Sequence, residues 1–145
     1  MKTSELLQAA RHLITPNENW CKNRLTKTNP NGTMAYCSLG ALDHVLTENV
    51  VLNGAVSNVF AEAFKLLNKS IPENVPYCGD IPIEDIVDLN DCSSHEDVLA
   101  TFDRAIAQAK VEEEMAVAQE QRLDAQVEEF IKDVLLVKPT ELEPA

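Results

Sequence analysis

The sequence is poor in residue types and patterns that several common kinds of site require. It has four glycines and one tryptophan in 145 residues, and aromatic residues make up only 5% of the chain. It contains no glycine-rich phosphate loop, no serine nucleophile elbow and no two-metal carboxylate pattern. Its apolar runs, such as 134–137, are far shorter than a bilayer-spanning helix requires. The sequence therefore argues against the familiar nucleotide-binding motifs and against a transmembrane helix.

Cysteine is also scarce. The four cysteines, Cys21, Cys37, Cys78 and Cys92, are too few and too irregularly spaced for a disulfide scaffold in a chain of this length. The first dozen residues turn polar quickly and lack the apolar region and cleavage site of a signal peptide. We therefore expect a cytoplasmic protein with reduced thiols.

What the sequence does have is an apolar content of 45% and a formal charge of −12. The apolar content suits one globular domain. The charge is uneven: residues 1–30 carry +3, residues 31–109 carry −9 and residues 110–145 carry −6. Such a chain is expected to bind neither nucleic acid nor an anionic membrane directly, but it could be attracted to a basic protein surface. The alternative is that the acidity only keeps the protein soluble.

Apolar residues recur at helical spacing in four stretches, which predicts an all-α, compact bundle of about four helices. The stretches cover about 3–14, with Thr3 or Ser4 as cap, 33–46, 55–68 and 93–109. The segments 15–32 and 69–92 are predicted loops, the second with one short helical turn at 83–87. Gly40, inside the second stretch, predicts a tight helix–helix crossing because glycine is costly within a helix.

The fourth helix is expected to continue into a long C-terminal extension. Ser93 to Glu96 reads as a capping box, and neither glycine nor proline follows before Pro139. Four acidic residues interrupt the apolar face before it resumes at a spacing of 4, 3, 4 and 3. These acids are Glu112, Glu113, Glu114 and Glu120, and the resumed face consists of Leu123, Val127, Phe130, Val134 and Val137. The predicted organisation is a helical domain at 1–109, an acidic amphipathic extension at 110–138 and a disordered tail at 139–145.

Cys37 is the candidate nucleophile of a cysteine-dependent hydrolase, because the start of a helix can lower the pKa of a thiol. His95 would serve as its base and Asp91 would orient the histidine. His44 cannot easily serve, since seven residues place it about 10 Å along the same helix. The alternative, which we favour, is that Cys37 is a small core residue beside Gly40 and that no residue is catalytic.

Metal binding has weak support in the sequence. The spacing Cys92-x-x-His95 suits zinc, but no second pair of that kind accompanies it. Acidic residues crowd the segment before the fourth helix, without the alternation and central glycine of a calcium loop. These residues are Asp80, Glu84, Asp85, Asp88 and Asp91. Asn90 and Asp91 are expected to build the turn into the next helix. We predict no metal and no cofactor.

Trp20 is the one large apolar residue of the basic segment 15–32. It could stack on a base or another ligand. A lone tryptophan more often closes a small core, and we keep both interpretations.

Five pieces of the sequence occur together in a recognisable order: residues 10–14 with Trp20, residues 37–42, Asn90-Asp91, Val98-Leu99 and residues 102–106. As a set they resemble a family of small uncharacterised bacteriophage and bacterial proteins that share a domain of unknown function. The resemblance covers about residues 8–109 and implies no activity. If the protein is phage-encoded, it would act in the host cytoplasm.

The leading functional hypothesis is a non-enzymatic phage or bacterial accessory protein that binds another protein. The partner would be a host or phage protein with a basic surface, such as a defence or nucleic-acid-handling protein. Leu123, Val127, Phe130 and Val134 would anchor it, with acidic residues around them. The first alternative is a homo-oligomeric structural or virion component assembled through the C-terminal helix, and the second is the hydrolase that uses Cys37.

Overall fold

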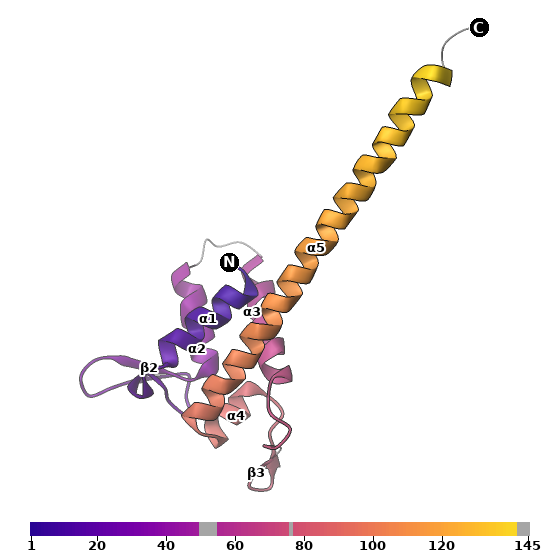
Figure 1. Cartoon of the computed structure of the whole chain (residues 1–145). Helices are drawn as coiled ribbons and strands as arrows, with labels where there is room; N and C mark the ends of the chain where they lie inside the picture. Colours follow the sequence, from indigo (N-terminus) through magenta and orange to yellow (C-terminus); the bar gives the residue numbers. More distant parts are fainter. Residues whose placement is uncertain (50–54, 76, 142–145) are drawn as a thin grey trace. The chain divides into compact units, whose positions relative to one another are not determined.

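The computed structural model describes residues 1–49, 55–75 and 77–141, without the side chains of residues 55–57 and 136–141. It is 69% helical (Figure 1). The chain divides into two compact units, Met1–Lys110 and Val111–Ala145. The helices are α1 (Thr3–Ile14), α2 (Ser38–Asn49), α3 (Ala55–Lys69), α4 (Ile86–Cys92) and α5 (His95–Glu141), with a 3-10 turn, η1, at Asn17–Asn19.

The first unit packs α1 to α4 and the beginning of α5 around one apolar core. The core side chains of α1 and α5 recur three and four residues apart, as the helical period requires. The largest fully buried side chain is Phe102 of α5. The other large apolar side chains with almost no exposure are Leu6, Leu7, Ile14, Leu42, Leu66, Leu67, Ile86, Leu89 and Val98. The third predicted stretch, 55–68, begins with residues 55–57, including Val56, whose side chains lie outside the described residues.

The prediction of an all-α fold is right for most of the chain and wrong for two short antiparallel hairpins. Strand β1 (Thr26–Thr28) pairs with β2 (Met34–Tyr36), and β3 (Tyr77–Cys78) pairs with β4 (Ile81–Pro82). In the first, the amide of Gly32 donates to the carbonyl of Asn29 at 2.9 Å, and Gly32 adopts φ +84°. Three-residue and two-residue strands are too short to show an alternating apolar pattern, so periodicity could not reveal them.

The predicted helix starts need correction. Thr3 lies inside α1, and Lys2 precedes it, with the Lys2 amide donating to Glu5 Oε2 at 2.8 Å. Helix α2 begins at Ser38 rather than near 33, because β2 occupies residues 34–36. At the start of α5 the Asp97 amide donates to Ser94 Oγ at 3.1 Å, so Ser94 caps this helix in place of Ser93.

Gly40 marks a close approach, but the neighbour is not a helix. A Cβ atom on Gly40 would lie 2.1 Å from the carbonyl oxygen of Leu25, which belongs to the segment before β1. The Leu25 carbonyl also accepts a hydrogen bond from the Cys37 amide at 3.1 Å. Gly40 therefore lets the backbone of residues 20–25 lie directly against the first turn of α2.

The expectation of four reduced thiols is also wrong. Cys78, in β3, and Cys92, at the end of α4, form a disulfide, while Cys21 and Cys37 are free and buried. The disulfide attaches the second hairpin to the helix that follows it. Because the two residues are 14 positions apart with a proline between them, the sequence offered no spacing motif for the pair.

The second unit consists of the remainder of α5, from Val111 to Glu141. The helix runs three residues into the segment that we predicted to be a disordered tail, and residues 142–145 lie outside the described residues. No helix of the described residues is long and apolar enough to cross a membrane.

Candidate functional site

Cys37 lies at the junction of β2 and α2, where its surroundings favour the neutral thiol. Its side chain is 4% exposed, and its sulfur accepts a hydrogen bond from the Gly40 amide at 3.3 Å. The Cys37 carbonyl accepts from the Ala41 amide, so Cys37 caps the helix. Burial raises the pKa of the Cys37 thiol, and the nearby amides of Gly40 and Leu39 only partly offset this. A nucleophilic cysteine needs the opposite shift.

His95 is engaged elsewhere. Its Nε2 lies 2.6 Å from the carbonyl oxygen of Ile14, and because a carbonyl only accepts, Nε2 is the donor. The imidazole also stacks on Trp20, with ring centroids 4.9 Å apart. Among the described residues, none of the hydrogen bonds of Cys37 reaches His95. Cys37 and His95 are therefore each held by other partners, Gly40 for the thiol and Ile14 and Trp20 for the imidazole.

Asp91 and its neighbour Asn90 hold the segment 20–25 in place instead of building the turn into α5. The Asp91 carboxylate accepts from the Asn23 amide at 2.8 Å. The fully buried Asn90 accepts through Oδ1 from Trp20 Nε1 at 2.8 Å and from the amide and hydroxyl of Ser38. Its Nδ2 donates to the Cys21 carbonyl at 2.9 Å.

One buried amide thus joins three segments that are far apart in sequence, which makes Asn90 the centre of a polar network. The sequence singled out Trp20 and Asn90 but could not connect them, because sequence spacing does not predict a contact between residues 70 positions apart.

Other residues of the resembling segments also make structural contacts. Arg11 of α1 forms a paired ionic hydrogen bond with Asp103 of α5, at 2.6 and 3.1 Å. Arg104 donates from Nε to the Ser70 carbonyl at 2.8 Å. These contacts fix the first part of α5 to α1 and to the end of α3.

Two of the acidic residues before α5 accept hydrogen bonds from backbone amides at the start of α4. Asp85 accepts from the Asp88 amide at 2.9 Å and caps α4, and Asp88 accepts from the Glu84 amide at 3.1 Å. In the part of the chain that the structure describes, no group of three or more histidine, cysteine or acidic side chains is placed to hold a metal ion.

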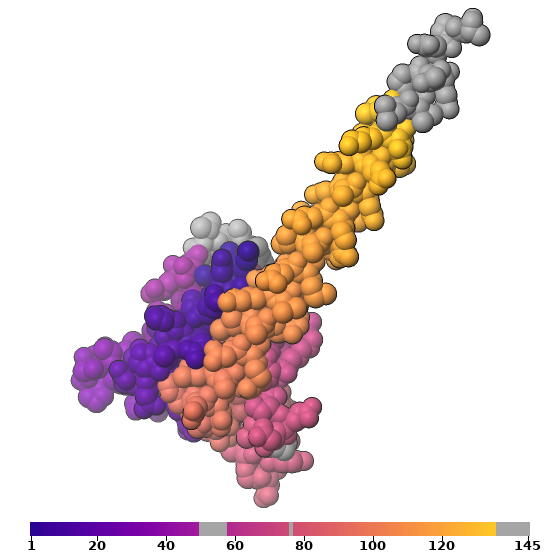
Figure 2. Space-filling model, viewed as in Figure 1, coloured from indigo at the N-terminus to yellow at the C-terminus, as the bar shows by residue number. Residues whose placement is uncertain are grey.

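The residues predicted to bind a partner lie in the second unit, and most are strongly exposed (orange to yellow in Figure 2). Leu123 is 54% exposed, Val127 55% and Phe130 68%, whereas Val134 is half-buried. The side chain of Val137 lies outside the described residues. We call Leu123, Val127, Phe130 and Val134, together with Glu112, Glu113 and Glu120, the α5 surface.

The members of the α5 surface share one side of the helix. At about 100° per residue, Val127, Phe130 and Val134 all lie within about 40° of Leu123, and Glu112 and Glu120 lie within about 60°. Residues 111–135 carry eight acidic and two basic residues. The α5 surface is therefore an apolar stripe with a strongly negative surrounding.

Residues 1–108 match a family of unknown function (DUF6197), and the chain belongs to that family. No curated protein and no solved structure matches the chain. The match ends just before Lys110, where the first unit ends, so the α5 surface lies outside the part that defines the family.

Proposed function

We propose that the protein acts by binding another protein through the α5 surface, without catalysing a reaction. The observation that carries the proposal is the exposure of Leu123, Val127 and Phe130 along one face of α5. Monomeric soluble proteins seldom expose several large apolar side chains in one stripe without a partner for them. An aromatic residue at the centre of such a stripe is a typical anchor of a helix that binds in a groove.

The partner we propose is a protein with an apolar groove and a basic rim. The net charge of −6 over residues 111–135 would attract such a rim and oppose binding to an acidic one. A nucleic-acid-handling or defence protein of a phage host, with a basic site for DNA or RNA, would meet this description. The acidic helix would then compete with the nucleic acid.

Charge also argues against a second copy of the chain as the partner. In a parallel, in-register dimer that uses the stripe as its seam, Glu113 and Glu120 would occupy the same seam positions as Val127 and Val134. Each glutamate would then face its own copy, and like charges at a buried seam are destabilising. A second copy of the chain is therefore the less favoured partner, and a measurement of the oligomeric state tests this alternative.

The test is to identify the partner and then to measure binding with purified proteins. A photo-crosslinking residue at Gln126, beside the stripe, would capture what contacts the α5 surface in cells of the native host. With the purified partner, Phe130→Asp should weaken binding by about 30-fold or more, because it places a charge in an apolar contact. Raising the salt from about 0.05 to 0.5 M should weaken binding further.

Val117→Asp is the matched control. Val117 is 52% exposed and lies about 120° around the helix from Leu123. Its substitution by aspartate therefore adds the same charge as Phe130→Asp, but outside the stripe. It should change affinity less than about threefold, the effect of a peripheral charge. Binding to the captured protein that survives both Phe130→Asp and high salt would refute the proposal.

A further inference from the structure

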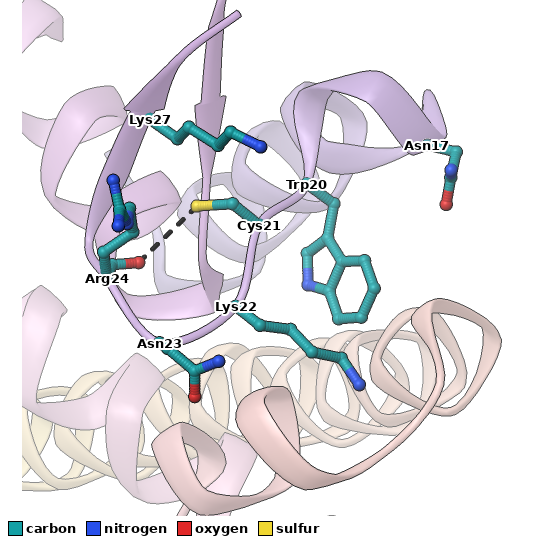
Figure 3. A pocket seen from close by; sticks show the side chains of 7 residues that line it. All are labelled: Asn17, Trp20, Cys21, Lys22, Asn23, Arg24 and Lys27. Atoms are coloured by element: carbon teal, nitrogen blue, oxygen red, sulfur yellow. Dashed lines mark hydrogen bonds between the residues drawn. The ribbon is translucent and has the colours of Figure 1, made fainter.

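A second feature, in the first unit, has a different chemistry from the acidic helix. A cavity of about 500 Å³ is lined by Asn17, Trp20, Cys21, Lys22, Asn23, Arg24 and Lys27. All of these residues come from one stretch of eleven. Figure 3 shows Lys27 above and Lys22 below the Trp20–Cys21 backbone, with Asn17 at the far side of the indole. The size is within the range of pockets that hold small molecules.

The charge of this cavity is opposite to that of the whole chain. Its lining has three cations and no carboxylate, in a protein of formal charge −12. Over the described residues, none of the three cations lies in an ion pair within 4 Å, although the Lys22 ammonium lies 5.3 Å from the Trp20 ring centroid. The three cations line one cavity, and an anion bound there would be attracted to each of them.

The backbone that presents these cations is fixed from beneath. Trp20 and Cys21 are hydrogen-bonded to the buried Asn90, and the Cys21 amide donates to the Tyr36 carbonyl at 3.1 Å. The Asn23 amide is held by Asp91, and Asn23 adopts φ +65°. A site whose frame is already ordered loses less entropy when a ligand binds.

We propose that this cavity binds a small molecule that bears a phosphate group. A phosphate offers several oxygens and about two negative charges, which suits the fork of Arg24, the ammonium groups of Lys22 and Lys27 and the amides of Asn17 and Asn23. A nucleic acid strand does not fit as well. It would extend beyond the cavity over a chain that carries −9 in residues 31–109.

The single tryptophan makes the test specific. Trp20 gives the only indole N–H signal in a nitrogen-correlated NMR spectrum, and that group is hydrogen-bonded to the buried Asn90 beneath the cavity. The protein would be titrated with pyrophosphate and with ribose 5-phosphate at constant ionic strength, with chloride and ribose as controls. We expect a saturable shift of the Trp20 indole and of the amides of residues 22–27, with a dissociation constant of about 1 mM or tighter.

Shifts with pyrophosphate alone would assign the site to inorganic phosphates, and shifts with ribose 5-phosphate as well would assign it to phosphate esters. The double variant Lys22→Gln/Arg24→Gln should weaken binding at least about tenfold, because charge-assisted hydrogen bonds are lost. Lys65→Gln/Lys69→Gln removes the same charge from exposed positions of α3 and should leave the affinity within about twofold.

An unchanged Trp20 indole signal in the ligand-free double variant would show that the site is still folded. The proposal is overturned if neither phosphate gives a saturable shift, if chloride or ribose gives the same shift, or if both double variants bind equally well.

Discussion

Two phenylalanines on the same helix show how the two units differ. Phe102 is completely buried in the core of the first unit, whereas Phe130, 28 residues further along α5, is 68% exposed. The helix before Lys110 is held by long-range contacts, such as Arg11 with Asp103 and Arg104 with Ser70. The segment after it exposes apolar side chains of the same kind, such as Leu123 and Val127. The buried phenylalanine therefore stabilises the fold of the first unit, whereas the exposed one in the second unit can contact a partner.

The largest expected effect tests this difference directly. Phe102→Ala should lower the free energy of unfolding by about 3–5 kcal/mol, because it leaves a cavity in the core. Phe130→Ala should change it by less than about 0.5 kcal/mol, as for a surface position. Urea unfolding followed by Trp20 fluorescence measures both. An equal loss in the two variants would mean that Phe130 is part of a core.

The disulfide belongs to the first unit, and its removal should affect that unit alone. Cys78→Ser/Cys92→Ser should lower the free energy of unfolding by about 2–4 kcal/mol, since the cross-link no longer restricts the unfolded chain. Thiol labelling of the denatured protein should detect two thiols before reduction and four after it, as the structure has two free cysteines. Four reactive thiols without reductant would show that the bond does not form under those conditions.

The polar network around Asn90 gives the next expected effect. Asn90→Ala leaves the Trp20 indole and the Ser38 amide without an acceptor, and each such buried group costs about 1–3 kcal/mol. We expect a lower midpoint of urea unfolding and a shifted indole signal. Asn58→Ala, at an exposed position of α3, is the control and should change stability by less than about 0.5 kcal/mol. An Asn90 variant as stable as this control would show that the network contributes nothing.

The smallest expected effect is the pH dependence that arises from the two buried thiols. Burial raises the pKa of both Cys21 and Cys37, so folding favours their neutral form. Their contribution to stability should be complete below the ordinary thiol pKa of about 8.5 and should decline as the pH rises through the higher folded values. Unfolding midpoints from pH 7 to about pH 10 measure this, and Cys21→Ala/Cys37→Ala should show less of the decline. A decline of the same size in that variant would assign it to other groups.

The sequence predicted the long elements well, because a helix of twelve or more residues repeats its apolar pattern several times. The stripes around Leu6, Val98 and Phe102 are of this kind, and all three side chains are buried. The two hairpins, the caps of α1 and α5 and the disulfide were missed. Each depends on a few particular residues and not on a repeating apolar pattern, so periodicity does not reveal it.

The two candidate sites also differ in how far the sequence revealed them. The stripe at Leu123, Val127 and Phe130 could be recognised because it is periodic. The cavity beside Trp20 was noticed only as a basic segment with one tryptophan, because its shape depends on contacts with Asn90, Asp91 and Tyr36. Gly40 was recognised as a close approach, but the sequence could not show that the neighbour is the Leu25 carbonyl.

The central claim is that the α5 surface binds another protein and does not bind its own copy. The most direct measurement is the mass of the free protein in solution, by sedimentation equilibrium at about 100 µM and at low and high salt. We predict a monomer of 16.1 kDa at both salt concentrations, for the wild type and for Phe130→Asp alike. A wild-type dimer that Phe130→Asp converts to a monomer would contradict the claim and would identify the stripe as a self-assembly seam.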